Sequence, residues 1–183
     1  MSENVFLISG RPGSGKTSLV RRIVESLGVR AGGFYTEETR GASGRRTGFE
    51  IVTFLGTRAP LAGVDIRSPY RVGKYGVNLK AIDEVAAPAV RNALEDCDLV
   101  VIDEIGKMEL YSQAFRDAVT DAVESGKPVL GTVMLGSHPW ADSVRSRADV
   151  RVFLIDPSSR DSVARLVRER LRPLIRKLGV NPG

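Results

Sequence analysis

The 183-residue sequence has almost none of the residues that mark extracellular, zinc-binding or membrane proteins. It contains one cysteine, Cys97, and one histidine, so it forms no internal disulfide and offers no Cys/His cluster for zinc. No apolar run approaches the roughly 18 residues that a membrane-spanning helix needs. Residues 1–4 carry no basic segment of the kind that begins a signal peptide. We therefore expect a cytoplasmic protein that does not associate with a membrane.

Aromatic residues are also sparse, at 6%, but apolar residues make up 42% of the sequence and charged residues 27%. An intrinsically disordered chain would have fewer apolar residues and a larger charge imbalance. The length suits one domain with a substantial core, and no linker, repeat or low-complexity segment divides it. We predict a single domain over residues 1–183 and favour a monomer, because nothing in the sequence marks a partner-binding face.

The formal net charge of +5 comes from the C-terminal segment 160–177, which holds seven basic and two acidic residues. Apolar residues recur there three or four apart, a spacing typical of a helix that packs one face against a core. The basic residues then occupy the solvent-facing side. Nucleic acid is an alternative partner for this surface, but we do not favour it, because no RNA-binding aromatic motif lies beside the segment.

Short apolar runs alternate with helical patterns along most of the chain. The runs are typical of strands buried on both faces of a parallel sheet, at residues 5–8, 99–102, 129–135 and 150–155. Helical spacing of apolar residues is found in segments 15–27, 79–94, 115–123 and 160–178. Pro88 must start a new turn or kink the second of these helices. The alternation predicts an α/β fold with a mainly parallel central sheet and helices on both of its faces.

The middle of the chain has a different pattern. Residues 32–38 and 47–55 are typical of two strands joined through the Gly-rich turn 41–46, which predicts an antiparallel hairpin. Residues 56–78 are rich in Gly, Pro and Arg and predict short antiparallel strands and loops. We therefore expect an antiparallel hairpin extension of the parallel sheet.

A glycine-rich segment connects the first predicted strand to the first helix. It matches the P-loop pattern G-x-x-x-x-G-K-[ST]. This P-loop consists of Gly10, Arg11, Pro12, Gly13, Ser14, Gly15, Lys16 and Thr17. Glycines let successive backbone N–H groups turn toward phosphate oxygens, and the positive end of the following helix adds to the attraction. We expect Lys16 to bridge the β- and γ-phosphates as a catalytic residue, and the Thr17 hydroxyl to ligate Mg²⁺.

Two acidic residues end the apolar run at 99–102. The predicted nucleotide-binding segment around them is Val100, Val101, Ile102, Asp103, Glu104, Ile105, Gly106 and Lys107. The carboxyl ends of strands form the edge where ligands bind in open α/β sheets. We expect Asp103 to hold Mg²⁺, directly or through water, and Glu104 to act as the general base or to position the attacking water.

Four segments together resemble a known protein family, namely residues 10–17, 33–38, 46–49 and 103–110. They closely resemble the THEP-type nucleoside-triphosphatases, and the likeness spans nearly the whole chain. Two later segments look like the family's His-Pro and Asn-Arg-Asp motifs, at Ser137-His138-Pro139 and Ser159-Arg160-Asp161. Ser159 stands where the family pattern has asparagine.

The resemblance implies a P-loop NTPase fold of the RecA/ASCE type, a three-layer sandwich with an additional strand between the P-loop strand and the Asp103 strand. It also implies a small magnesium-dependent phosphohydrolase that converts ATP, GTP and other nucleoside triphosphates to the diphosphate and phosphate. The sequence has no Asn-Lys-x-Asp segment of the kind that GTPases use to recognise guanine. We therefore expect broad base selectivity, with ATP, GTP, CTP and UTP as substrates.

Several further residues are candidates for contact with the γ-phosphate or the attacking water. Lys107 and Glu109 follow the acid pair closely, and the sequence is equally consistent with a functional role and with simple surface exposure. Arg45, Arg46 and Arg160 are candidates to stabilise transition-state charge, although each is individually more typical of a surface residue.

Two other functions fit the same motifs. A P-loop kinase would pass the γ-phosphoryl group to a nucleotide, a metabolite or a nucleic-acid end, and Glu104 would deprotonate the acceptor hydroxyl. The turn 41–46 or the loop 67–75 would then serve as its lid. A nucleotide-dependent switch would use slow hydrolysis to reset a binding surface, for which the basic C-terminal helix is the obvious place.

Overall fold

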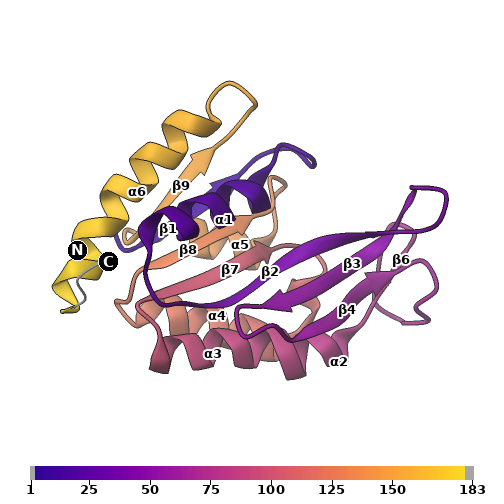
Figure 1. The fold of residues 1–183 in the computed structure, drawn as a ribbon. Helices are drawn as coiled ribbons and strands as arrows, with labels where there is room; N and C mark the ends of the chain where they lie inside the picture. The colour runs from indigo at the N-terminus through magenta and orange to yellow at the C-terminus, as the bar shows by residue number, and fades with distance from the viewer. Residues whose placement is uncertain (1–2, 180–183) are drawn as a thin grey trace.

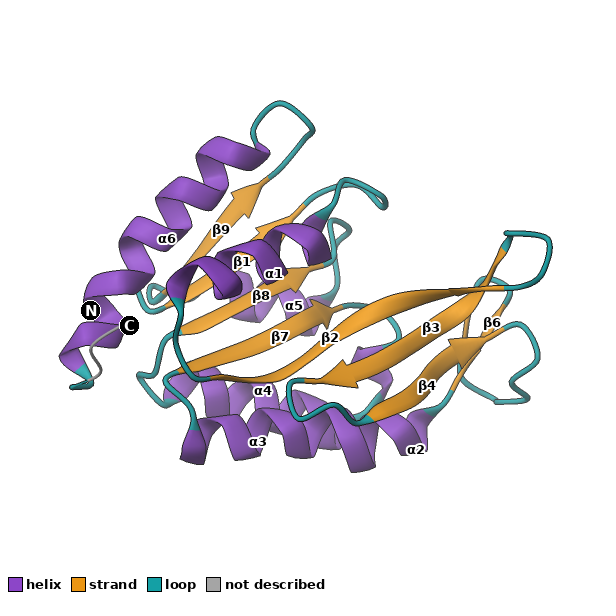
Figure 2. Cartoon of the chain, viewed as in Figure 1, coloured by secondary structure: helices purple, strands orange, loops and turns teal. Residues whose placement is uncertain are grey.

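The computed structural model describes residues 3–179, in which one nine-stranded sheet lies between two layers of helices (Figures 1 and 2). Residues 1–2 and 180–183 of the predicted domain 1–183 lie outside the described part. The strand order is β5-β6-β4-β3-β2-β7-β8-β1-β9. The strands are β1 (Val5–Ser9), β2 (Ala31–Arg40), β3 (Arg46–Thr53), β4 (Arg58–Gly63), β5 (Arg71–Val72), β6 (Tyr75–Val77), β7 (Leu99–Ile105), β8 (Val129–Val133) and β9 (Val150–Leu154).

The parallel half of the sheet consists of β2, β7, β8, β1 and β9. All residues of β1 and β8 are buried, as expected for apolar strands that are covered on both faces. Strand β8 lies between the P-loop strand β1 and the acid-bearing strand β7. This order confirms the predicted ASCE-type arrangement and the P-loop NTPase fold class.

One long strand, β2, connects the parallel half of the sheet to the antiparallel half. The first residues of β2 pair in parallel with β7, from Ala31 opposite Leu99 onward, and its remaining residues pair antiparallel with β3. Strands β4, β6 and β5 then continue the sheet beyond β3. The extension therefore adds four antiparallel strands beyond β2, and the predicted β2–β3 hairpin forms the part nearest to the parallel half.

Helices cover both faces of the sheet, as predicted (Figure 2). They are α1 (Lys16–Leu27), α2 (Leu79–Ala81), the π-helical turn Ile82–Ala86, α3 (Ala87–Asp96), the 3₁₀ turn Glu109–Tyr111, α4 (Gln113–Glu124), α5 (Pro139–Arg145) and α6 (Arg160–Lys177). Helices α1 and α6 pack on one face, and α2 to α5 pack on the other. None of the helices in residues 3–179 is long and apolar enough to cross a membrane.

Alternate side chains of the parallel strands fill two separate cores. In β7, Val100 and Ile102 contact the α3–α4 core, which also contains the edge-to-face ring pair of Phe34 and Phe115 at 6.0 Å. Leu99 and Val101 contact the core under α1 and α6 instead. The sheet is thus held rigidly from both sides, and its strand ends provide a fixed platform for the site.

Three local predictions differ from the structure. Strand β7 extends to Ile105 instead of ending at Ile102, because its pairing with β8 resumes after a register shift, with Ile105 opposite Val133. Strand β8 ends at Val133, two residues earlier than predicted. The sequence pattern also missed helix α5, a short helix capped by His138, whose side chain accepts a hydrogen bond from the Trp140 amide.

Pro88 behaves as predicted. It lies in the first turn of α3, directly after the π-helical turn, so it starts a new helical segment. The Ala87 amide still donates to the Ile82 carbonyl oxygen in the π-helical turn, so Pro88 lies where the hydrogen-bond spacing changes within a continuous helical stretch.

Candidate nucleotide-binding site

The glycine-rich loop links the buried end of β1 to the first turn of α1. Gly15 has φ of 85°, a left-handed conformation that side chains disfavour. A Cβ atom on Gly10 would lie 2.8 Å from both the Ile155 carbonyl oxygen and the Ser14 Oγ. Both glycines are therefore required by the backbone path of the loop, which places its amide groups at the N-terminus of α1.

Two polar side chains of the loop are placed to meet a phosphate. The Lys16 ammonium donates hydrogen bonds to the carbonyl oxygens of Gly10 at 3.1 Å and Arg11 at 3.3 Å. The Ser14 hydroxyl is buried and has no hydrogen-bond partner among the described residues. Buried polar groups without partners are costly, so an oxyanion in this loop is stabilising.

Asp103 lies beside the loop, inside strand β7. Its side chain is 1% exposed, and its two carboxylate oxygens accept hydrogen bonds from the Thr132 hydroxyl at 2.6 Å and the Thr36 amide at 3.5 Å. Burial raises the pKa of Asp103, and hydrogen bonds from the hydroxyls of Thr132 and Thr17 oppose that rise. The predicted metal ligands Asp103 and Thr17 are therefore brought together.

This donor set fits Mg²⁺. A carboxylate and a hydroxyl from neighbouring elements offer the oxygen ligands that magnesium prefers, and the ion usually takes one or two such protein groups and keeps several waters. A cation would also offset the cost of burying the Asp103 charge, the main cause of its raised pKa. Thr17 and Asp103 are thus the residues of this chain that would hold the metal.

Glu104 follows Asp103 on the strand and is partly exposed. Burial raises the pKa of Glu104, and the nearby Lys16 ammonium lowers it. The effect of the Lys16 charge on Glu104 is consistent with both residues belonging to one site at this edge of the sheet. A carboxylate with a raised pKa is a suitable proton acceptor.

Glu109, which the sequence left open between function and surface exposure, is buried, with 4% of its surface exposed. Its Oε2 atom and the Oε1 atom of Glu104 each lie 3.0 Å from the position of a Cβ on Gly106, so the two carboxyl groups meet at that glycine. Burial, followed by the negative charge of Glu104, raises the pKa of Glu109 to about 8. Glu109 is therefore mainly protonated at neutral pH.

The Glu109 carboxyl group is expected to make the folded chain less stable as the pH rises. Its pKa rises from an ordinary 4.5 in the unfolded chain to about 8 in the folded one. Between these values the folded chain binds more protons, so the free energy of unfolding falls as pH rises, by at most about 1.4 kcal/mol per pH unit. Glu109→Gln is expected to be less sensitive to pH than the parent. Urea unfolding at pH 5 and pH 8 in EDTA measures this difference.

Glu95→Gln is the matched control, because Glu95 is an exposed glutamate of α3. It should leave the pH dependence of the parent unchanged. An equally steep loss of stability in Glu109→Gln would show that Glu109 is not the buried neutral acid described above.

Arg160 reaches the glycine-rich loop from the start of α6. Its Nη1 atom lies 2.7 Å from the position of a Cβ on Gly15, so the guanidinium covers the turn that leads into Lys16. The structure therefore keeps Arg160 as a candidate for contact with nucleotide phosphates. Its neighbour Ser159, which replaces an asparagine of the family pattern, accepts a hydrogen bond from the Asp156 amide at 2.9 Å and serves the local turn.

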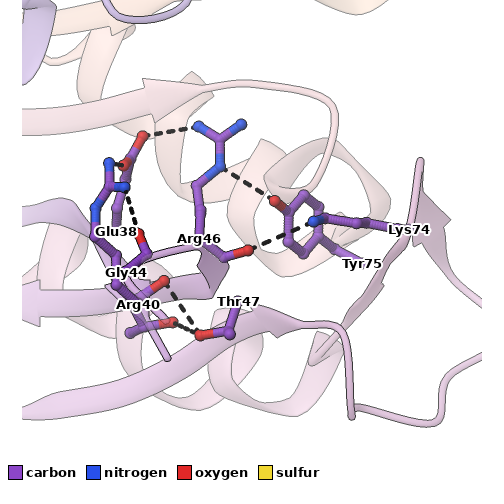
Figure 3. Close-up of polar contacts among 8 residues, drawn as sticks. Glu38, Arg40, Gly44, Arg46, Thr47, Lys74 and Tyr75 are labelled. Atoms are coloured by element: carbon purple, nitrogen blue, oxygen red, sulfur yellow. Dashed lines mark hydrogen bonds and ion pairs between the residues drawn. The ribbon is translucent and has the colours of Figure 1, made fainter. Parts of the chain in front are cut away.

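Arg46 is committed to the antiparallel extension instead (Figure 3). Its guanidinium donates hydrogen bonds to Glu38 at 2.7 Å and to the Tyr75 hydroxyl at 3.1 Å, and the Lys74 ammonium approaches its carbonyl oxygen at 3.5 Å. These contacts join the β2–β3 hairpin to the β5–β6 turn. Arg46 is therefore a structural residue and not a free phosphate-binding group, while Arg45 is exposed.

The apolar members of the predicted nucleotide-binding segment need a correction. These residues are at most 1% exposed and fill the two cores, so they position the acids and do not contact a ligand; they are Val100, Val101, Ile102 and Ile105. Gly106 lies between the Glu104 and Glu109 carboxyl groups. Lys107 is exposed at the same edge of the sheet.

A P-loop, a buried aspartate on a neighbouring parallel strand and an intervening strand define the class of P-loop nucleoside-triphosphate-binding proteins. The sequence model of a family described as NTPase matches residues 5–168. The nucleoside-triphosphatase THEP1 of Thermotoga maritima is 44% identical over 158 residues, which cover 86% of this chain and 90% of that protein. The human cancer-related nucleoside-triphosphatase is 41% identical, over 88% and 92% of the two chains.

Two solved structures of nucleoside-triphosphatases are also similar to this chain. The crystal structure of THEP1 from Aquifex aeolicus superposes with a TM-score of 0.79 at 38% identity and covers 89% of this chain and 95% of that one. The solution structure of the human cancer-related nucleoside triphosphatase has a TM-score of 0.77, also at 38% identity, with 94% and 98% covered. The chain belongs to this nucleoside-triphosphatase family.

Proposed function

We propose that the chain is a magnesium-dependent nucleoside-triphosphate phosphohydrolase that releases phosphate from ATP, GTP, CTP and UTP and leaves the diphosphate. The observation that carries this proposal is the meeting of Lys16, Thr17, Asp103 and Glu104 at one edge of the sheet. The printed names of the relatives describe nucleoside-triphosphatases, which supports the hydrolytic part. The proposed use of magnesium rests on the oxygen ligands of Thr17 and Asp103. The proposed broad base selectivity rests on the sequence, which has no Asn-Lys-x-Asp segment.

Each residue has a separate task in this proposal. The loop amides and Lys16 bind the β- and γ-phosphate oxygens, for which Lys16 must leave its present contacts with the Gly10 and Arg11 carbonyls. Thr17 and Asp103 hold Mg²⁺, directly or through water, and the bound metal neutralises charge on the phosphate oxygens. Glu104 accepts the proton of the attacking water.

In the proposed reaction, water attacks the γ-phosphate and the nucleoside diphosphate leaves. The water oxygen forms a new bond to the γ-phosphorus while the bond from that phosphorus to the bridging β–γ oxygen breaks. The released proton passes to Glu104, and the diphosphate carries the negative charge that the P-loop and Lys16 already contact. Glu109 is protonated at neutral pH and so does not compete for this proton.

Broad base selectivity predicts similar efficiencies for different nucleotides. The chain has no Asn-Lys-x-Asp segment to hydrogen-bond a particular base. Small differences in a pocket contribute about 1–3 kcal/mol, so kcat/KM for ATP, GTP, CTP and UTP is expected to stay within about two orders of magnitude. Steady-state phosphate release with each nucleotide measures the four values. A strict requirement for one base would remove this part of the proposal.

A cytoplasmic location is a further part of the proposal. The single cysteine, Cys97, needs no oxidising compartment, and burial raises the pKa of its thiol, which makes the reactive thiolate scarcer.

A further inference from the structure

A second cavity lies beside the residues described above. It has a volume of about 380 Å³, within the range of about 300–1,000 Å³ that is typical of pockets for small ligands. Three segments distant in the sequence form it: the β5–β6 turn with Arg71, the loop after β7 with Lys107 and Tyr111, and the end of the β8–α5 loop with His138. No residue of the P-loop lines it.

The position of the cavity favours a ligand. Lys107 and Tyr111 follow strand β7, and His138 follows the neighbouring parallel strand β8. Ligands of open α/β sheets bind outside the carboxyl ends of such strands. Lys107 comes three residues after Glu104, so the cavity adjoins the acid-bearing loop and not the glycine-rich loop.

The cavity is basic and lacks a neutralising acid. No carboxylate lines it, and neither Arg71 nor Lys107 forms an ion pair within residues 3–179. Arg71 uses one guanidinium nitrogen to donate to the Lys74 carbonyl oxygen at 2.8 Å, which holds the side chain in the turn. Arginines elsewhere in the extension, such as Arg46 and Arg58, are paired with glutamates. Two unpaired cations in one concave site fit an oxyanion.

His138 adds a third donor. Its Nδ1 atom accepts a hydrogen bond from the Trp140 amide at 3.2 Å, so in the neutral ring the proton is on Nε2. The ring is held in place by its role as the cap of α5. A hydrogen-bond donor is therefore offered to the cavity in the neutral as well as the charged form of the histidine.

An aromatic surface completes the site. The Tyr111 ring is 40% exposed, and its hydroxyl donates to the Arg71 carbonyl oxygen at 2.9 Å, which fixes the ring against the β5–β6 turn. Tyr70 packs beside it with ring centroids 5.2 Å apart. Two exposed aromatic rings next to an oxyanion site suit a ligand that joins a phosphate to a planar ring, because bases stack on aromatic side chains.

We propose that this cavity binds a nucleoside monophosphate, with the phosphate at Arg71, Lys107 and His138 and the base at Tyr111. This inference goes beyond hydrolysis at the P-loop and does not depend on it. A second bound nucleotide at this position would allow the chain to respond to the monophosphate concentration while the triphosphate occupies the P-loop.

Isothermal titration calorimetry with AMP tests the proposal. AMP is expected to bind to the parent whose P-loop is filled with a non-hydrolysable ATP analogue and magnesium, and equally to Lys16→Ala. Arg71→Ala is expected to weaken this binding at least about tenfold, the loss of one charge-assisted hydrogen bond, while ATP hydrolysis is kept. Arg67→Ala is the matched control, because Arg67 is exposed in the same loop and does not line the cavity.

Each other outcome overturns the proposal. AMP binding that disappears when the analogue fills the P-loop, or that is absent from Lys16→Ala, would assign the monophosphate to the P-loop. Equal affinities of Arg71→Ala and Arg67→Ala would remove the cavity as the site. Inorganic phosphate that binds as tightly as AMP would show that Tyr111 contributes nothing, and so would an unchanged affinity in Tyr111→Ala.

Discussion

Glu104→Gln is expected to lower kcat roughly 10²- to 10⁴-fold, the range for a positioned general acid or base, while the Kd for nucleotide stays close to that of the parent. Glutamine keeps the size and hydrogen-bonding capacity of the side chain but cannot accept the proton of water. Lys16, Thr17 and Asp103 remain in place to hold the triphosphate and its metal. The loss should therefore appear in turnover and not in binding.

Asp103→Asn is the natural comparison for this variant. It removes a buried carboxylate from the proposed metal site, so its binding of Mg²⁺ should weaken, and excess magnesium should partly restore its turnover. No magnesium concentration should restore Glu104→Gln. Nucleotide Kd and kcat of both variants across a magnesium series separate the two roles. Near-parental turnover of Glu104→Gln would remove Glu104 as the base.

Lys16→Ala is expected to lower kcat/KM for ATP at least about 100-fold, because a cation with contacts to two phosphates is lost and each charge-assisted hydrogen bond contributes about 1.5–3 kcal/mol. The fold should survive, since the hydrogen bonds that the Lys16 ammonium donates within residues 3–179 go to carbonyl oxygens of the loop itself. Thermal unfolding followed by circular dichroism checks this point, and steady-state phosphate release measures the activity.

Arg22→Ala provides the matched control for the lysine variant. Arg22 is on the same helix, about half exposed and paired with Asp161, so its removal takes away one positive charge of α1 outside the loop. Its activity should stay near that of the parent. If Lys16→Ala bound and hydrolysed ATP like the parent, the assignment of the glycine-rich loop as a phosphate site would be wrong.

The parallel half of the fold was predictable because its signals are local. Strands β1 and β7 are continuous apolar runs, and the glycine-rich loop and the acid pair occur where each run ends. The ASCE-type strand order followed from the family resemblance, since no local pattern specifies which strands become neighbours. The structure places β8 between β1 and β7, in agreement with that resemblance.

The surroundings of the acids were not predictable, because they depend on contacts between distant segments. Thr36 and Thr132 hydrogen-bond to Asp103 from strands β2 and β8, and only the sheet order brings them to it. The burial of Glu109 depends on the 3₁₀ turn after β7, which no apolar periodicity marks. The positions of two arginine side chains likewise depend on tertiary partners. Arg46 contacts Glu38 and Tyr75, whereas Arg160 lies against the P-loop.

The antiparallel extension shows a different limit of the sequence. Its outer strands are short, since β5 and β6 have only two and three residues, so they show no periodic pattern. The Arg46 side chain also joins distant parts of the extension, because it donates a hydrogen bond to the hydroxyl of Tyr75, 29 residues away (Figure 3). Pattern alone therefore predicted the hairpin but not the order of the outer strands.

Phosphate release from ATP by the purified protein, with magnesium and without any acceptor or partner, tests the central claim most directly. The account predicts many turnovers per protein molecule, one phosphate for each ADP formed, and loss of this activity when EDTA removes the metal. Release that occurs only after an acceptor hydroxyl or a partner protein is added would contradict it, and would favour a kinase or a nucleotide-dependent switch instead.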